Sequence, residues 1–122
     1  MVWNYKNLDV WKKAFEMIKE VYDVTGKFPR DEIYNLTSQL RRAVVSISSN
    51  IAEGCGRRTS RDFVGFMYNA IGSLKEVESE LFVAEKLGHV DMVDVEKLVV
   101  ELEEIGRMIS EMIRKESERG IR

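Results

Sequence analysis

Five arginines gather in one stretch of this 122-residue chain, at positions that suit the binding of a phosphate. Arg57, Arg58 and Arg61 follow a glycine-rich turn and lead into the predicted start of a helix. Guanidinium groups, free backbone N–H groups and the helix dipole can together hold an anion there, although the spacing matches no nucleotide-binding fingerprint. Two interpretations stay open. These residues, with Arg41 and Arg42, contact the backbone of RNA or DNA without reading its sequence, or they pair with acids of a neighbouring subunit.

Polar side chains recur at helical spacing on two consecutive predicted helices. The first stripe, about 100° wide on a helical wheel, consists of Arg42, Ser46, Asn50 and Glu53. The second consists of Asn69, Ser73 and Glu76. We interpret the two stripes as an interhelical hydrogen-bond network that fixes register and subunit geometry, with Arg42 facing Glu76 or Glu80. The alternative interpretation is a polar pocket for a ligand or nucleotide.

The sequence does not favour a catalytic or metal centre. Cys55 lies near the arginines, which could lower its pKa, but a catalytic thiol usually needs a histidine. The single histidine, His89, follows a glycine in a predicted turn. Glu76, Glu78 and Glu80 are metal ligands in composition only, because the Glu-x-x-His motif of a metal-binding bundle is missing. We therefore predict no enzymatic activity, no cofactor and no metal.

The elements that position these side chains follow from apolar residues that recur every three or four positions, which is the pattern of amphipathic helices. The first predicted helix begins near Leu8 and ends at Gly26. The second begins at Pro29, a residue favoured in the first turn of a helix. It continues through Ile33, which we expect to face inward, until Gly54 stops it.

The same spacing predicts two more helices. Thr59-x-x-Asp62 is a capping-box variant that opens the third, and Gly88 closes it. The fourth begins at one of the aspartates that follow, and we expect it to fray into a disordered tail over about 115–122. Because the connections are short, sequential helices should run antiparallel. The predicted fold is all-α, an antiparallel up-down-up-down four-helix bundle in a single domain over residues 1–122.

The second and third helices differ from the other two in their charge. Residues 43–52 and 63–74 contain no charged side chain, although a third of the chain is charged. A helix that is neutral on every face is best explained by burial on two sides. Gly65 and Gly72 suggest close approach of another backbone, because glycine inside a helix costs about 1 kcal/mol relative to alanine. We infer self-association through the hairpin of these two helices.

Composition limits the remaining possibilities. The net charge of −2 argues against a uniformly basic surface, but the charge is uneven. Residues 41–61 hold five arginines and one acid, whereas residues 75–104 hold ten acids and three lysines. This polarity suits anionic ligands at one end or contacts between subunits. With one cysteine, no long apolar run and no visible secretory signal, we expect a cytoplasmic protein without a membrane span.

Four segments resemble the four-helix bundle family known as 23S rRNA intervening-sequence proteins. They are LDVWKKA at 8–14, FPRDEIYNLTSQLRRA at 28–43, SISSNIAEGCGRR at 46–58 and GSLKEVESEL at 72–81. The likeness covers nearly the whole chain. One departure is Ser48, where the family usually has proline.

The resemblance implies an antiparallel four-helix bundle that assembles as a homopentamer. Members are often encoded within insertions in large-subunit ribosomal RNA genes. A related branch, the accessory variability determinant of diversity-generating retroelements, binds a reverse transcriptase and nucleic acid, but that branch is strongly basic and this chain is not. We expect a non-enzymatic homo-oligomer that acts as an RNA- or DNA-associated accessory protein. The alternative is a structural adaptor between proteins that binds no nucleic acid.

Overall fold

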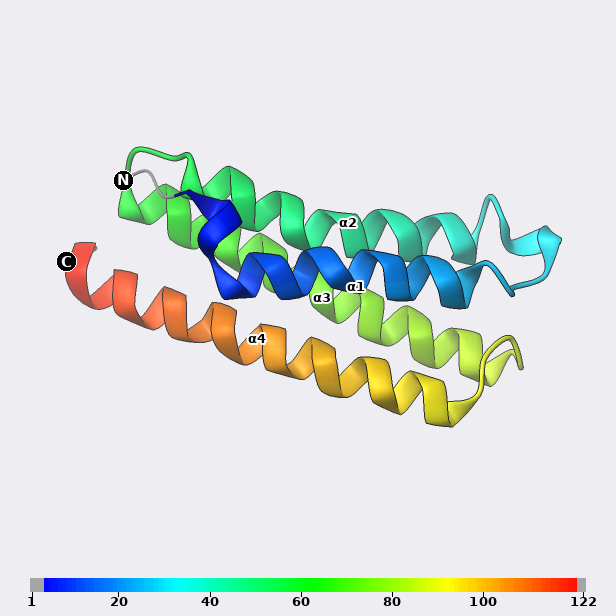
Figure 1. Cartoon of the computed structure of the whole chain (residues 1–122). Coiled ribbons are helices and arrows are strands. Elements are labelled where there is room, and N and C mark those ends of the chain that lie inside the picture. The colour runs from blue at the N-terminus through cyan, green and yellow to red at the C-terminus, as the bar shows by residue number, and fades with distance from the viewer. Residues whose placement is uncertain (1–3, 121–122) are drawn as a thin grey trace.

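The computed structural model describes residues 4–120, and this part of the chain contains four long helices (Figure 1). They are α1 (Asp9–Thr25), α2 (Leu36–Cys55), α3 (Ser60–Lys86) and α4 (Met92–Gly120). Two short 3₁₀ helices, Tyr5–Asn7 and Arg30–Glu32, precede α1 and α2. Successive long helices run in opposite directions, and the described residues contain no strand. The predicted all-α, antiparallel up-down-up-down bundle is confirmed.

Each helix packs against its neighbours in the chain, and α4 returns to α1. The contact between α2 and α3 is the most extensive, and the contact between α1 and α4 is the least. The predicted apolar stripes form the core, since Leu40, Met67 and Ile105 are at most 1% exposed. Each such side chain contributes about 1.5–3 kcal/mol through burial. The α1–α4 boundary is therefore the one that the core holds least firmly.

The start of α2 was predicted wrongly. A helix was expected from Pro29, but the chain first makes the 3₁₀ turn that follows this residue, and α2 begins at Leu36. Asn35 has φ −129° and ψ −110°, which lies outside the helical region. Ile33, which was expected to face the core, is 51% exposed. Proline fixes its own φ at a value that a helix accepts, but it does not require the following residues to be helical.

Both predicted ends of α3 are confirmed. Thr59 Oγ1 accepts a hydrogen bond from the backbone N–H of Asp62 at 3.1 Å, which satisfies one of the donors left unpaired at a helix start. At the other end Gly88 has φ +78°, and its N–H donates to the carbonyl oxygen of Glu85 at 2.9 Å. Glycine adopts this left-handed conformation without steric cost, so the helix ends there.

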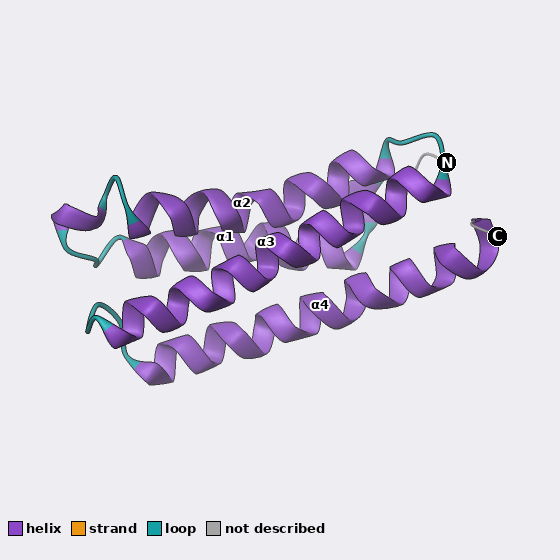
Figure 2. Ribbon diagram, turned by 180° about the vertical axis from the view of Figure 1, so that it is seen from behind, coloured by secondary structure: helices purple, strands orange, loops and turns teal. Residues whose placement is uncertain are grey.

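Helix α4 extends beyond its predicted end. The chain was expected to fray over 115–122, whereas the helix continues to Gly120. Glu116 is only 2% exposed, and Ser60 Oγ donates a hydrogen bond to its Oε2 at 2.9 Å. This bond joins the end of α4 to the start of α3, at the end of the bundle where Figure 2 places the C-terminus. Residues 121–122 lie outside the described residues.

The uncharged stretches of α2 and α3 are only partly covered by the rest of the chain. Val45 on α2 is 37% exposed, and Tyr68 on α3 is 59% exposed. Gly65 and Gly72 are also exposed, so the outer face of this helix pair is neutral but not buried. No helix in residues 4–120 is long and apolar enough to cross a membrane.

Candidate functional site

The five arginines form two separate groups at the two ends of α2. Arg41 and Arg42 lie in its first half, and Arg57, Arg58 and Arg61 follow its last residue, Cys55. We call the second group the basic turn. At 1.5 Å per residue the helix separates the two groups by about 20 Å. The fold therefore does not bring the five predicted contact residues into one patch.

Arg41 is held within the chain. Its Nε donates a hydrogen bond to Thr25 Oγ1 at 2.9 Å, and its guanidinium lies over the ring of Tyr22, 4.4 Å from the ring centre. Thr25 in turn donates to the carbonyl oxygen of Val21 at 2.7 Å. Hydrogen bonding and cation–π attraction together fix this guanidinium against the end of α1. Arg41 thus links two helices and is poorly placed to contact phosphate.

The basic turn borders a polar hollow. Arg57 forms a 2.9 Å ion pair with Glu53, and its guanidinium lies 4.5 Å from the centre of the Phe66 ring. Arg58 and Arg61 are exposed on the same turn. The hollow has a volume of about 350 Å³ and is lined by Arg57, Arg61, Asp62, Gly65, Phe66 and Asn69. The turn therefore places two guanidinium groups beside an open, mostly polar surface at the start of α3.

The two predicted polar stripes meet between α2 and α3. Ser73 Oγ donates a hydrogen bond to Ser46 Oγ at 2.9 Å, across the two helices. Asn50 Nδ2 donates to Ser46 Oγ at 2.9 Å and to the Ser46 carbonyl oxygen at 2.8 Å. We call these three residues the polar seam. These bonds are of the kind that the predicted hydrogen-bond network requires. A hollow of about 590 Å³ also borders Arg42 and Ser46 of the same stripe, so the polar pocket stays the alternative.

A charged group continues the same line along α3. The pKa of Glu80 is raised to about 7, first by burial and then by the charge of Glu76 and a hydrogen bond with it, while the positive charge of Arg42 acts in the opposite direction. Glu80 Oε1 is buried and has no hydrogen-bond partner among the described residues. The charge of Arg42 thus reaches Glu80, but no ion pair or hydrogen bond joins the two side chains in residues 4–120, so their pairing stays a prediction.

Within a single chain nothing approaches the two glycines that the sequence singled out, and their expected contact with another subunit stays a prediction. A Cβ atom at Gly65 or Gly72 would have no heavy atom within 4 Å, so no other part of the chain packs closely against these two residues. The close approach occurs at Gly54, where a Cβ would lie 2.9 Å from Met67 Cε and 3.0 Å from Phe66 Cβ. Sequence reasoning had treated Gly54 only as a stop signal. From the sequence alone, a glycine near a helix end could either end the helix or let a neighbouring helix pack closely against it.

The fold separates the cysteine from the histidine. Cys55 ends α2 and is fully buried, and burial raises the pKa of its thiol to about 11. His89 lies at the other end of the bundle, where its Nε2 is 2.9 Å from Glu32 Oε2 and its ring packs against Phe28. A thiol in this setting is not a nucleophile at neutral pH. No group of three or more His, Cys, Asp or Glu residues suited to a metal ion occurs in residues 4–120.

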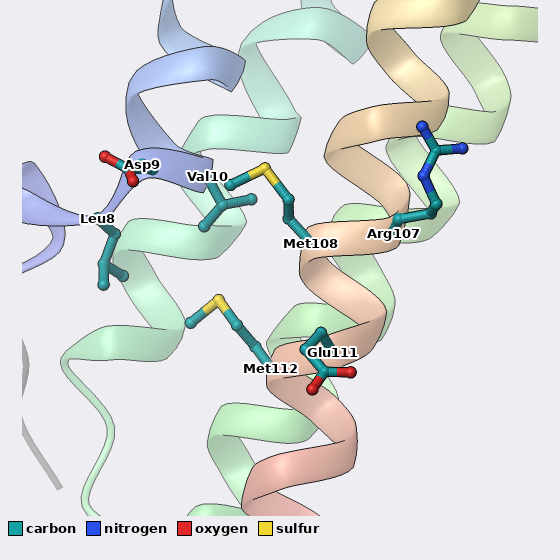
Figure 3. A pocket seen from close by; sticks show the side chains of 7 residues that line it. All are labelled: Leu8, Asp9, Val10, Arg107, Met108, Glu111 and Met112. Atoms are coloured by element: carbon teal, nitrogen blue, oxygen red, sulfur yellow. The ribbon is translucent and has the colours of Figure 1, made fainter.

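Sequence reasoning missed a groove between the start of α1 and the second half of α4. It has a volume of about 670 Å³, and its lining is mostly apolar. Figure 3 shows Met108 and Met112 reaching from α4 toward Val10 of α1 and toward Leu8, the residue before α1, while Arg107 points away. The apolar spacing predicts the helices on either side of this groove but not the space between them, and Leu8, Met108 and Met112 are only partly buried there.

Comparisons with known proteins agree on the fold. The sequence profile of the family described as 23S rRNA-intervening sequence protein matches residues 6–111. A crystal structure of a protein of unknown function from the S23 ribosomal protein family of Bacteroides thetaiotaomicron is similar, with a TM-score of 0.76 and 22% sequence identity. The similarity covers 85% of this chain and 97% of that chain. A search of curated proteins found no match.

Proposed function

Because the chain belongs to the 23S rRNA-intervening sequence protein family, we propose that it is a non-enzymatic accessory protein that forms a homo-oligomer and binds RNA or DNA. The outer face of α2 and α3 would join the subunits, and the basic turn would contact phosphate groups. The observation that carries the proposal is the position of the basic turn, where Arg57 and the exposed Arg61 line a polar hollow directly beside the neutral face.

The neutral face supports self-association. It exposes Val45 and Tyr68 and has open space above Gly65 and Gly72, so another helix could approach the glycines and pack against these side chains without meeting a charge. An exposed apolar area beside polar residues is typical of protein interfaces. The homopentamer implied by the resemblance is the assembly we propose. Ser46, Asn50 and Ser73 would then lie at the edge of the subunit contact.

Repetition of the basic turn supports binding to nucleic acid. A single copy offers few cations, but several copies in a closed ring would form a basic rim. Contacts with phosphate are independent of sequence and weaken steeply as salt increases. The acidic charge elsewhere, including residues 75–104, would confine the nucleic acid to this rim.

The test is the fluorescence anisotropy of a labelled RNA hairpin and a labelled DNA duplex over a salt series, with light scattering on the same samples. The variant carries alanine at Arg57, Arg58 and Arg61. The control carries alanine at Lys27, Arg30 and Lys86, which removes the same charge at the opposite end of the bundle. Each lost phosphate contact should reduce the slope of log K against log salt by about 0.9 on duplex DNA.

We expect the variant without the three arginines to keep the mass of the oligomer and to lose affinity for nucleic acid, while the control keeps both. If the unchanged protein binds neither nucleic acid at low salt, the nucleic-acid role is wrong. One observation favours a second function, a protein–protein adaptor: the guanidinium groups of Arg41 and Arg57 are already paired within the chain. If the basic turn served subunit contacts in such an adaptor, the variant would lose mass instead.

A further inference from the structure

A small cavity of about 60 Å³ lies between α1 and α4, at the boundary that the core holds least. We call it the acidic cleft. Its lining residues are Lys13, Glu16, Met17, Glu20, Glu101, Glu104 and Ile105. Four carboxyl groups from two helices thus face one another beside one lysine, in a space too small to hold more than a few waters.

Two of these carboxyl groups, Glu20 on α1 and Glu101 on α4, line the same small space. A hydrogen bond between them, which would raise the pKa of Glu20, requires one of them to carry a proton, since an ionised carboxylate only accepts. The pKa of Glu20 is raised to about 7, first by burial and then by a hydrogen bond with Glu101 and the charges of Glu101 and Glu16, while the charge of Lys97 lowers it. Glu101 Oε2 is buried and has no partner among the described residues. The pair is therefore unfavourable when both groups are ionised.

Few other polar contacts hold this boundary. Lys13 Nζ lies 3.3 Å from Glu104 Oε1, but both side chains are nearly half exposed, so this ion pair contributes little. Farther along the same boundary, the apolar groove leaves α1 and α4 apart at the start of α1. The Glu20–Glu101 pair therefore lies at the boundary where packing holds α1 least.

We propose that the Glu20–Glu101 pair is a proton-dependent latch between α1 and α4. The latch is closed while the two carboxyl groups share a proton, and it opens more readily when both are ionised. Opening would separate α1 from α4 and uncover the apolar side chains of Met17 and Ile105, which are at most 1% exposed when the latch is closed. This inference does not depend on the proposed binding of nucleic acid or on self-association.

The direction of the pH effect follows from the proton affinities of the two states. In the open state Glu20 would return toward its ordinary pKa of 4.5, whereas in the closed state the pKa is about 7. The closed state thus binds the proton more tightly, and its stability falls as the pH rises from about 4.5 through 7. Between pH 6 and pH 8 the equilibrium constant for opening should increase about tenfold.

Hydrogen exchange of the intact protein, followed by mass spectrometry and corrected for the intrinsic exchange rate at each pH, measures this opening. The α1 amides should show an opening constant that rises about tenfold from pH 6 to pH 8. In Glu20→Gln the rise should disappear, because the titrating carboxyl group is gone. In Glu101→Gln the rise should become clearly smaller, because the repulsion between the two charges is lost and the amide N–H can donate to the Glu20 carboxylate, while burial of Glu20 remains.

Glu103→Gln is the matched control, because Glu103 lies on the same helix, is exposed and does not line the acidic cleft. It should keep the tenfold rise. The latch is refuted if exchange in α1 of the unchanged protein does not vary over this pH range, if the full tenfold rise persists in Glu20→Gln, or if Glu101→Gln leaves the rise unchanged. A rise confined to α3 would assign the pH effect to Glu80 and would also refute the latch.

Discussion

Gly54→Ala is the substitution whose effect the structure defines most sharply. The new Cβ would lie 2.9 Å from Met67 Cε, 3.0 Å from Phe66 Cβ and 3.4 Å from the Phe63 carbonyl oxygen. Carbon atoms in proteins pack at about 3.5–4.0 Å. The Met67 methyl group could move if it had space, but Met67 is fully buried. Phe66 Cβ is attached directly to the α3 backbone, so α2 and α3 would have to separate.

The expected cost is the difference between two terms. Overpacking of a well-filled core typically costs about 1–3 kcal/mol. Replacing glycine with alanine inside a helix stabilises the helix by up to about 1 kcal/mol. The gain is smaller here, because Gly54 is the second-to-last residue of α2. Gly54→Ala should therefore lower the free energy of unfolding by about 1–2 kcal/mol.

Two other glycines provide the control, because the same change there meets nothing. Gly65 and Gly72 lie inside α3, and a Cβ at either would have no heavy atom within 4 Å. Each alanine should raise the free energy of unfolding by about 0.5–1 kcal/mol. One substitution thus has opposite signs at positions that the sequence does not distinguish.

Urea unfolding followed by circular dichroism measures all three variants, and the slope of the transition shows whether the unfolded state has changed. The packing argument fails if Gly54→Ala is neutral or stabilising. The argument about open space fails if Gly65→Ala and Gly72→Ala lower the stability of an isolated subunit. Light scattering should accompany each measurement, because a change in mass would show that a methyl group at these glycines meets a second copy.

Three further expectations concern buried or paired side chains. Cys55 should not react with a thiol reagent at pH 8 until the protein is unfolded, because burial raises its pKa to about 11. Ser60→Ala should lower the free energy of unfolding by about 1–3 kcal/mol in urea, because it removes a hydrogen bond from the buried carboxylate of Glu116. A double-mutant cycle on His89 and Glu32 should give a coupling of about 0.5–1.5 kcal/mol, and a value near zero would show that this contact does not join the two loops.

The sequence predicted the long helices well because the residues that determine a helix and its ends lie close together in the chain. Residues such as Ile47 and Leu74 recur at the helical period, and each is at most 1% exposed. Thr59 and Gly88 mark the ends of α3 because capping depends on residues within one turn. The start of α2 could not be read in this way, since proline at position 29 is compatible with both a helix and an extended residue.

The predictions that failed depend on residues distant in the chain. The polar end of α4 gave no sign of order, because Glu116 is buried by contact with Ser60, 56 residues earlier. The five arginines are near one another in the sequence, but the rise of α2 separates them into two groups. Which arginines are paired also depends on Tyr22 and Phe66, which come from other helices. The polar seam was predictable because both of its stripes lie on adjacent antiparallel helices.

The latch and the proposed assembly can be tested separately because they occupy opposite sides of the bundle. The helices pack in the order α1, α2, α3, α4, so the α2–α3 face and the α1–α4 boundary share no helix. Gly72→Ala should therefore leave the hydrogen exchange of the α1 amides unchanged, and Glu101→Gln should leave the mass of the assembly, measured by light scattering, unchanged. If either variant altered both properties, assembly would depend on the position of α1. The neutral face would then not be sufficient to join the subunits.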